Sequence, residues 1–512
     1  MQLILTKVAV ECITQKLLFL CVLCLSKNGL FSKEITMFNI MNGKKRSLFS
    51  VNMIALLIIG AMTNASASQF RLVKDVNPGA DSSNINYMSG DRQLFFWAND
   101  GSGTGKQAWT IDGAHGGVIK ISNIDDTIYS HMAGKADLSV GVHQFFQLRR
   151  ESDWGYELWT GTALGVTKLR EIPGYVGIAQ TVKALGKYFF VPSDDTVHGK
   201  ELWVSDGTTA GTYMVKDIVP GSSGSNPHEL TEVGDQLYFM VGDNLWQSDG
   251  IGANTRLSRS FECPACEVSD VDLVAVVNKT LYIRWYKHIN GVSNYELWRY
   301  ETDSGQTSKV KTFTNLPARE DAHYAGVGNI LYFLNQTDST YGSRKYGLWK
   351  TDGTSAGTTL IKEWDGVEWH IDALLTPAAG MLYFRGGNDE NRELWVSNGT
   401  SQGTVQVKDI NGDSANSSNL SHLTTVGRNL YFTYTLPYSI TGDFWMSNGV
   451  EAGTAETDFR VDSTKHPVVI NGRLYFYGGD KINSSYGWEL YTDDGSSSPA
   501  VTLTPVIMYL LN

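Results

Sequence analysis

One unit recurs nine times along this chain, at intervals of 43 to 52 residues. Two markers recur in register in every copy: a tryptophan (a tyrosine in the last copy) and an aromatic segment of the Leu-Tyr-Phe type. A repeat of this length is a supersecondary unit that buries its apolar faces only by stacking on its neighbours. The first marker stands at Trp109, Trp159, Trp203, Trp246, Trp298, Trp349, Trp395, Trp445 and Tyr491, and the second at Leu94, Phe145, Tyr188, Leu237, Leu281, Leu331, Leu382, Leu430 and Leu474.

Each copy contains four short strand signals. In the clearest region, residues 200–205 and 211–218 predict the last two strands of one copy, and residues 229–233 and 236–241 predict the first two of the next. Apolar and polar residues alternate there, and Asp-Gly or Asn-Gly pairs mark turns. The sequence predicts an all-β fold: a single β-propeller of nine four-stranded antiparallel blades over residues 68–512. Eight blades, with one degenerate or split unit, is the alternative.

Three copies are especially well preserved. They read ELWVSDGTTAGT (201–212), GLWKTDGTSAGT (347–358) and ELWVSNGTSQGT (393–404). These segments resemble the ELWxxDGT-repeat proteins, a family of exported bacterial proteins. The resemblance covers nearly all of residues 70–500 and weakens at 108–113, 157–162 and 296–305. It implies a β-propeller and export, and it implies no specific activity.

The beginning of the chain has the pattern of an export signal. A basic run (44–46) precedes an apolar stretch (48–62), which ends at an Ala-Ser-Ala site (65–67). This order is typical of a cleaved signal peptide. We expect a signal peptide over residues 41–67, a gene-model extension over residues 1–40, and export to the periplasm, the cell surface or the medium.

The net charge of the chain limits the classes of partner that we expect. The chain has 42 basic and 53 acidic residues, a net charge of −11. Such a surface repels nucleic acid and anionic lipid, and no stretch after residue 67 is as long and apolar as a membrane span. We expect no nucleic-acid partner, no membrane span and a monomer.

Only Cys263 and Cys266, of five cysteines, lie beyond the leader. In an oxidising compartment two cysteines this close predict a local disulfide. A redox dithiol, which needs a βαβ context, and a zinc site, which needs a second ligand pair, are the alternatives. The sequence predicts no cofactor and no metal.

Two segments compete to close the ring. Residues 71–79 (RLVKDVNPG) match the fourth-strand segment MVKDIVPG of residues 214–221. This match predicts that the N-terminus donates the closing strand to the last blade. Residues 499–506 (PAVTLTPV) are an alternative for the same place.

The loops between the second and third strands, and those between units, vary most and predict the binding face. They include residues 191–200, 283–295, 335–347 and 363–372. Exposed tryptophans in or beside these loops would suit stacking on sugars or anchoring a protein. Capping of the blade ends is the alternative role. The candidates are Trp154, Trp285, Trp364 and Trp369.

Three histidines form a second candidate set. His323, His422 and His466 each stand eight residues before the Leu of their second marker, where another copy has Glu229. Equivalent positions occupy equivalent places in a ring, here near one mouth of the channel. Three imidazoles there could hold a metal or an anion. A polar position facing a wet channel is the alternative.

Two functions fit these observations. The first is an exported binding or scaffold protein that recognises a polysaccharide or a protein through its variable loops. The second is a secreted carbohydrate-active hydrolase or lyase, which needs a suitably spaced catalytic set near the axis. The sequence has no nucleophile elbow, phosphate-binding loop or zinc-protease motif. We favour binding and leave catalysis open.

Overall fold

The computed structural model describes residues 70–493, apart from 79–81, 104, 112–116, 123–128, 132–137, 151, 173–176, 194–196, 314–323, 339–344, 366–374, 389–390, 411–418, 437–438 and 482–486. The predicted signal peptide, the N-terminal extension and the segment 499–506 lie outside the described residues. All described residues belong to one compact unit of the chain.

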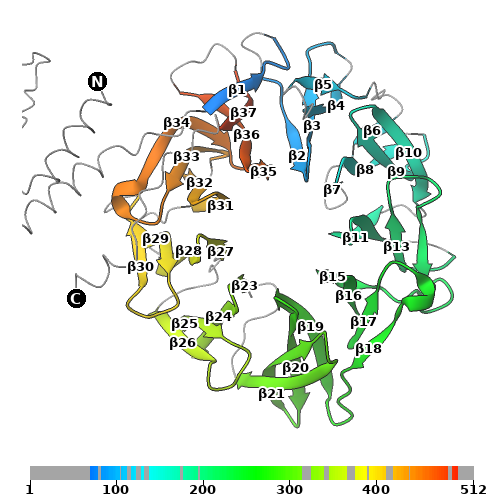
Figure 1. Cartoon of the computed structure of the whole chain (residues 1–512), viewed down its shortest axis with the longest axis vertical. Helices are drawn as coiled ribbons and strands as arrows, with labels where there is room; N and C mark the ends of the chain where they lie inside the picture. Colours follow the sequence, from blue (N-terminus) through cyan, green and yellow to red (C-terminus); the bar gives the residue numbers. More distant parts are fainter. Residues whose placement is uncertain are drawn as a thin grey trace, which may run out of the picture. The chain divides into compact units, whose positions relative to one another are not determined.

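The described strands form antiparallel units that follow one another along the chain (Figure 1). We number these units in chain order. Unit 1 contains β2 (Asn86–Gly90), β3 (Leu94–Asn99), β4 (Lys106–Ile111) and β5 (Val118–Lys120). Unit 2 contains β6 (Tyr129–His131), β7 (Leu138–Val140), β8 (His143–Arg150), β9 (Tyr156–Thr162) and β10 (Gly165–Ile172). Unit 3 contains β11 (Ile178–Ala184), β12 (Lys187–Pro192), β13 (Leu202–Ser205) and β14 (Tyr213–Lys216).

The middle of the chain continues the pattern. Unit 4 contains β15 (His228–Val233), β16 (Gln236–Val241), β17 (Asn244–Ser248) and β18 (Arg256–Ser260). Unit 5 contains β19 (Val268–Val277), β20 (Thr280–Ile289), β21 (Val292–Glu301) and β22 (Gln306–Phe313). Unit 6 contains β23 (Tyr324–Val327), β24 (Ile330–Asp338), β25 (Lys345–Thr351) and β26 (Thr359–Asp365).

The last three units complete the series. Unit 7 contains β27 (Thr376–Ala378), β28 (Met381–Asn388), β29 (Asn391–Ser397) and β30 (Thr404–Lys408). Unit 8 contains β31 (Asn419–Val426), β32 (Asn429–Thr435), β33 (Thr441–Ser447) and β34 (Thr454–Asp462). Unit 9 contains β35 (Val468–Ile470), β36 (Arg473–Asp480) and β37 (Glu489–Asp493), and β1 (Phe70–Lys74) joins it. Short 3-10 helices, η1 (Gly252–Asn254) and η3 (Glu451–Gly453), lie in turns.

The units close into a ring. The innermost strand of each unit contacts that of the next, in the order β2, β7, β11, β15, β19, β23, β27, β31 and β35, and β35 contacts β2. This is the β-propeller that the repeat predicts (Figure 1). The blade number stays a prediction, because pairing of β34 with β36 joins units 8 and 9 in one eight-stranded sheet.

The N-terminal strand closes the ring, as predicted. β1 pairs with β37 as the outermost strand of unit 9, with Phe70 opposite Asp493. The backbone N–H groups of Val76 and Ser83 donate to the Glu489 carboxylate at 3.1 and 2.9 Å. This arrangement repeats that of Glu201 in unit 3, which accepts from the backbone of two residues in the following loop, Val219 and Ser225.

The core consists of apolar layers between adjacent units. Trp203 and Phe190 of unit 3, for example, pack with Leu158 and Leu169 of unit 2. Each marker tryptophan is buried, or partly buried against such a cluster. Burying a large aromatic side chain contributes roughly 1.5–3 kcal/mol. The marker residues therefore hold neighbouring units together, which is the structural role expected for them.

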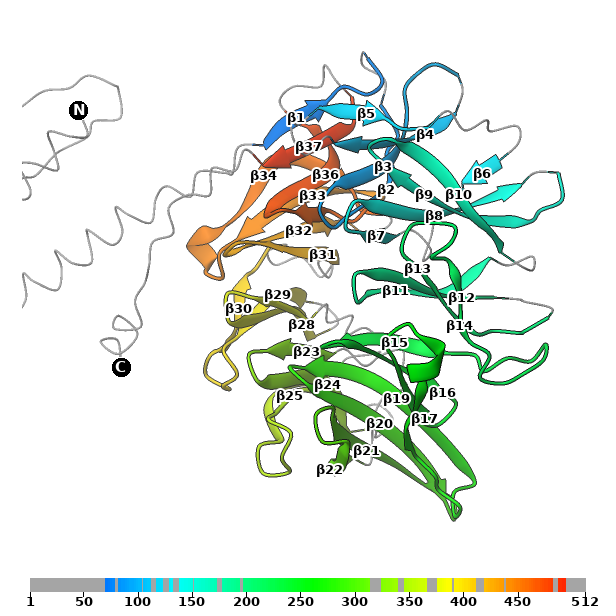
Figure 2. The same ribbon diagram turned by 45° about the vertical axis from the view of Figure 1, so that its right-hand side comes forward.

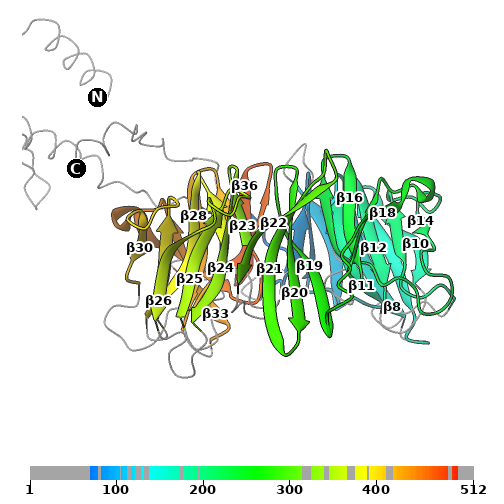
Figure 3. The same cartoon turned by 90° about the horizontal axis from the view of Figure 1, so that it is seen from below.

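Unit 5 differs from the sequence prediction. Residues 283–295, expected to be a variable loop, are mostly strand: β20 and β21 are joined only by Asn290 and Gly291, both with positive φ (51° and 75°). A two-residue Asn-Gly turn is a strong hairpin signal. β19, β20 and β21 have ten residues each. In the side view their hairpin reaches past neighbouring strands (Figure 3), and Figure 2 shows the same sheet obliquely.

Candidate functional site

The preserved Asp-Gly-Thr motif forms a self-contained turn. Asp206 Oδ1 accepts hydrogen bonds from the backbone N–H and the hydroxyl of Thr208, at 2.9 and 2.8 Å. Thr208 Oγ1 accepts from the N–H of Gly211, and the Thr212 hydroxyl donates to the Thr208 carbonyl. The same bonds recur around Asp352 and around Asn398. The motif is therefore structural.

The second glycine of the motif is required by this turn. A Cβ at Gly211 would lie 2.0 Å from Asp206 Oδ1, and one at Gly403 would lie 2.0 Å from Asn398 Oδ1. No side chain fits at that distance. The recurrence of Gly-Thr in the motif thus reflects close packing against the capping carboxylate or amide.

A cation on the outermost strand of one unit reaches the next unit at five junctions. In each case the cation lies opposite the Leu that directly precedes the marker Trp or Tyr of the same unit. Lys216, for example, lies opposite Leu202, which precedes Trp203. The contacts are Lys74 Nζ with the Trp109 ring (5.0 Å to the centroid), Arg170 with Trp203 (4.3 Å), Lys216 Nζ with the Thr255 carbonyl (2.7 Å), Lys311 Nζ with Trp349 (5.3 Å) and Lys362 Nζ with Trp395 (4.8 Å).

The junction between units 4 and 5 departs from this pattern. Arg259 holds the same register position, opposite Leu245, and its side chain is exposed. Within the described part of the chain it makes no hydrogen bond, ion pair or ring contact. The cation close to the Trp298 ring is instead Lys287 of unit 5 itself, whose Nζ lies 5.7 Å from the ring centroid. The cation that crosses at those five junctions is therefore free here, and Lys408, opposite Leu394 in unit 7, likewise lacks such a contact in the described residues.

A groove opens at this junction, with a volume of about 430 Å³. Residues 257–262, from β18 and the start of the following loop, line one side. Trp285 and Trp298 of unit 5 line the other. Sequence reasoning identified Trp285, but it assigned Trp298 to the core and missed Arg259. The signal that could have found the groove is the segment RLSRSF, which replaces the YMVKDI pattern of the preceding unit.

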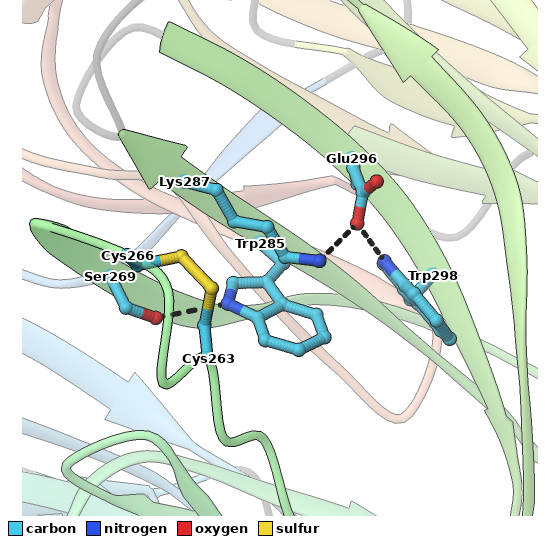
Figure 4. The surroundings of a disulfide bond; sticks show 7 residues. All are labelled: Cys263, Cys266, Ser269, Trp285, Lys287, Glu296 and Trp298. Carbon is cyan, nitrogen blue, oxygen red and sulfur yellow. Dashed lines mark hydrogen bonds and ion pairs between the residues drawn. A yellow bond between two sulfur atoms is a disulfide. The ribbon is translucent and has the colours of Figure 1, made fainter. Parts of the chain in front are cut away.

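Lys287 and Glu296 hold the tryptophan wall of the groove (Figure 4). Lys287 Nζ lies 3.5 Å from the centroid of the Trp285 ring and 2.7 Å from Glu296 Oε2. The Trp298 indole N–H donates to the same oxygen at 2.9 Å. Burial acts to raise the pKa of Glu296, but hydrogen bonds from Lys287, Trp298 and Lys309 outweigh it and hold this pKa below its usual range. Glu296 is therefore an ionised structural anchor.

The predicted disulfide between Cys263 and Cys266 is present, with Cα atoms 5.3 Å apart. It lies in the loop from β18 to β19 and close to Trp285 (Figure 4). The Trp285 indole N–H donates to Ser269 Oγ at 3.0 Å. The disulfide thus restrains the loop at one end of the groove.

Of the predicted tryptophans, Trp154 and Trp285 have opposite environments. Trp154 is 53% exposed in the turn between β8 and β9, with φ of 61°. The Arg149 guanidinium lies 4.2 Å from its ring centroid, so one ring face is covered. Trp285 is only 7% exposed, and its ring packs edge-to-face on Phe261.

The remaining predicted tryptophans do not join this groove in the described structure. Trp364 is partly buried between units 6 and 7, where its ring packs edge-to-face on Phe384 and Trp395. Trp369 lies outside the described residues, as does His323.

His422 and His466, which hold equivalent positions in the repeat, lie next to each other. They belong to adjacent units, and their ring centroids are 4.1 Å apart. Burial, with a contribution from His466, lowers the pKa of His422 to about 4. Glu229 makes the matching contact between units 4 and 5, because its carboxylate accepts from the backbone N–H of Leu273. Glu229 and His422 both have φ of 55°.

The described residues contain no group of three or more metal-ligating side chains. Among them there is also no helix of the length and apolarity needed to cross a bilayer.

Comparisons with known proteins bear on the fold alone. No protein-family model matches the chain, and no curated protein matches it. Similar solved structures include dipeptidyl peptidase 4 from Porphyromonas gingivalis, at 10% identity and a TM-score of 0.45, with 70% of this chain and 60% of that chain covered. Another is the β-propeller domain of the Trilobed protease from Pyrococcus furiosus, at 9% identity and a TM-score of 0.35, with 73% and 98% covered.

A third similar structure is an oligogalacturonate lyase in complex with manganese, at 12% identity and a TM-score of 0.33, with 65% of this chain and 94% of that chain covered. The chain spans about three fifths of the length of the dipeptidyl peptidase.

Proposed function

We propose that this protein is an exported binding protein, which holds a chain-like ligand, a polysaccharide or a polypeptide, in the groove between units 4 and 5. The observation that carries this proposal is the free Arg259, which lines a groove at a position whose equivalents cross to the next unit at five other junctions. A position where one copy departs from a repeated contact is a candidate functional site, since the remaining copies supply the rigid frame.

The groove has features that suit binding more than turnover. Its wall is held by Glu296, which is fully engaged with Lys287, Lys309 and Trp298. Its accessible surface combines the Arg259 guanidinium and the Glu262 carboxylate with aromatic side chains. Interfaces favour aromatic and Arg anchors with a polar rim.

A secreted carbohydrate-active hydrolase or lyase remains the alternative function. The carboxylates that the sequence offers for it, Asp194, Asp195, Asp321, Asp372, Asp389 and Glu390, all lie outside the described residues. No contact in the described structure favours this alternative.

The experiment is a thermal-unfolding screen of the protein with neutral oligosaccharides, acidic oligosaccharides and extended peptides. A ligand at about a hundred times its Kd adds roughly 2.7 kcal/mol to the free energy of unfolding, which shifts the midpoint visibly. Each ligand that shifts the midpoint is tested on Arg259→Ala and on Arg71→Ala. Arg71 is an exposed arginine on another outermost strand and is the matched control.

We expect a midpoint shift that persists in Arg71→Ala and is lost in Arg259→Ala. An identical shift in both variants would place the ligand elsewhere and contradict the proposal. Turnover of a bound oligosaccharide would favour the enzyme alternative.

A further inference from the structure

We propose that the ligand of the groove is an extended polypeptide that adds to β18 as a further strand and places an acidic side chain against Arg259. This inference rests on the proposed function and narrows its ligand to one class. The direction of the groove, its charge and the burial of its aromatic wall favour this class of ligand.

The groove follows the edge of β18. All residues from Leu257 to Glu262 line it, although neighbouring side chains in a strand point to opposite faces. Four of these residues, Leu257 to Ser260, are consecutive in β18, so the surface that they share includes the backbone edge of the strand. β18 pairs only with β17 in the described part of the chain. Its outer N–H and C=O groups are thus the kind of edge that accepts another strand.

The edge carries two exposed arginines against one carboxylate of the groove lining, Glu262, and this balance favours an acidic partner. Arg256 and Arg259 are both exposed on β18, and neither makes an ion pair with another described residue. They stand out on a chain with a net charge of −11. A guanidinium binds a carboxylate through two parallel hydrogen bonds. An Asp or Glu side chain on the added strand would therefore fix its register.

The aromatic wall favours a peptide over a sugar. Stacking on a sugar requires an open ring face, but Trp285 is 7% exposed, with Lys287 over its ring and Phe261 at its side. Trp298 also has Lys287 nearby and its indole N–H is bound to Glu296. The covered Trp285 ring thus suits apolar contact with a peptide side chain better than stacking of a sugar.

A second copy of this chain fits the edge poorly. Antiparallel pairing of two β18 strands would bring Arg256 and Arg259 of one copy near those of the other. Like charges on paired strands are destabilising. The charge on the edge therefore disfavours a symmetric dimer at this site.

The test uses the protein and three fluorescent synthetic peptides, measured by anisotropy. The first alternates Val and Thr around a central Glu. The second replaces this Glu with Lys, and the third is the Glu peptide N-methylated at alternate amides. Neutral and uronate oligosaccharides serve as competitors. The variants are Arg259→Glu and the matched control Arg71→Glu, with circular dichroism to confirm that both are folded.

The Glu peptide should bind the wild-type protein and Arg71→Glu equally, and Arg259→Glu at least about tenfold more weakly, a difference of ~1.4 kcal/mol. The Lys peptide should show the reverse preference for Arg259→Glu. N-methylation should abolish binding, because it removes the main-chain donors.

Four results would overturn the inference. Binding that survives N-methylation would exclude strand addition. An oligosaccharide that binds in an Arg259-dependent way while the peptides do not would leave the proposed function standing and replace its ligand class. Arg259-dependent dimerisation in light scattering would assign the edge to a second copy. If neither peptides nor oligosaccharides bind in an Arg259-dependent way, both the inference and the proposed function fail.

Discussion

The Tyr332 hydroxyl of unit 6 lies directly beneath Gly399 of unit 7, where a Cβ would come within 2.3 Å of the hydroxyl oxygen. Tyr383 and Gly449 repeat this relationship at the next junction, also at 2.3 Å. The tyrosine of one marker and the turn glycine of the next unit are therefore parts of one contact between units.

Gly399→Ala should destabilise the protein by two separate effects. Gly399 has φ of 84°, which costs Ala about 1–2 kcal/mol, and the clash with Tyr332 adds about 1–3 kcal/mol. Gly380→Ala is the matched control, since it has φ of 80° and open space around its Cβ. Denaturant unfolding should show the larger loss for Gly399→Ala. Tyr332→Phe should restore part of it, and equal losses at the two glycines would refute the clash.

Lys362→Met should weaken the junction between units 6 and 7. Lys362 Nζ lies over the Trp395 ring and donates to the Thr404 carbonyl at 3.4 Å. Losing both contacts should lower the free energy of unfolding by about 1–2 kcal/mol. Arg259→Met changes the equivalent position, where no contact exists, and should be neutral. A comparable loss in both variants would show that the side-chain stem, and not the cation, stabilises the junction.

Glu489 should make the protein less stable as the pH rises. Burial raises the pKa of this carboxyl to about 7, against the opposing hydrogen bonds from Val76 and Ser83, while the unfolded value is near 4.5. Between about pH 4.5 and 7 the folded state thus binds one more proton than the unfolded state. The free energy of unfolding should fall across this window, by at most about 3 kcal/mol. Urea unfolding of Glu489→Gln at several pH values should lack this fall.

His422 should make the protein less stable as the pH falls, which is the opposite of the effect of Glu489. Because its pKa is about 4 in the folded protein and 6.5 in the unfolded chain, the unfolded state binds more protons between these values. Stability should therefore decrease as the pH falls from about 6.5 to 4. Asn tolerates the positive φ of residue 422, so His422→Asn is the variant to compare by urea unfolding. An unchanged pH profile in His422→Asn would show that the histidine pair does not govern acid stability.

The repeat predicted much of the fold, because its markers report contacts that every unit makes. The order of four strands and the closing strand within residues 71–79 both follow from placing equivalent residues in equivalent positions. The groove could not be predicted in the same way. Arg259 resembles Lys216 in charge and position, and the sequence does not show that Lys287 of unit 5 lies over Trp285 and near Trp298.

The closing strand also has a consequence for how the chain folds. The hydrogen bond from Val76 to Glu489 joins residues 413 positions apart, and β1 can pair only after β37 has formed. Contacts this distant in sequence carry a large loop-closure entropy and form late. The first of the described strands to be synthesised is thus the last to reach its place. Until it does, β37 presents an open edge, and aggregation during folding should be greatest in that interval.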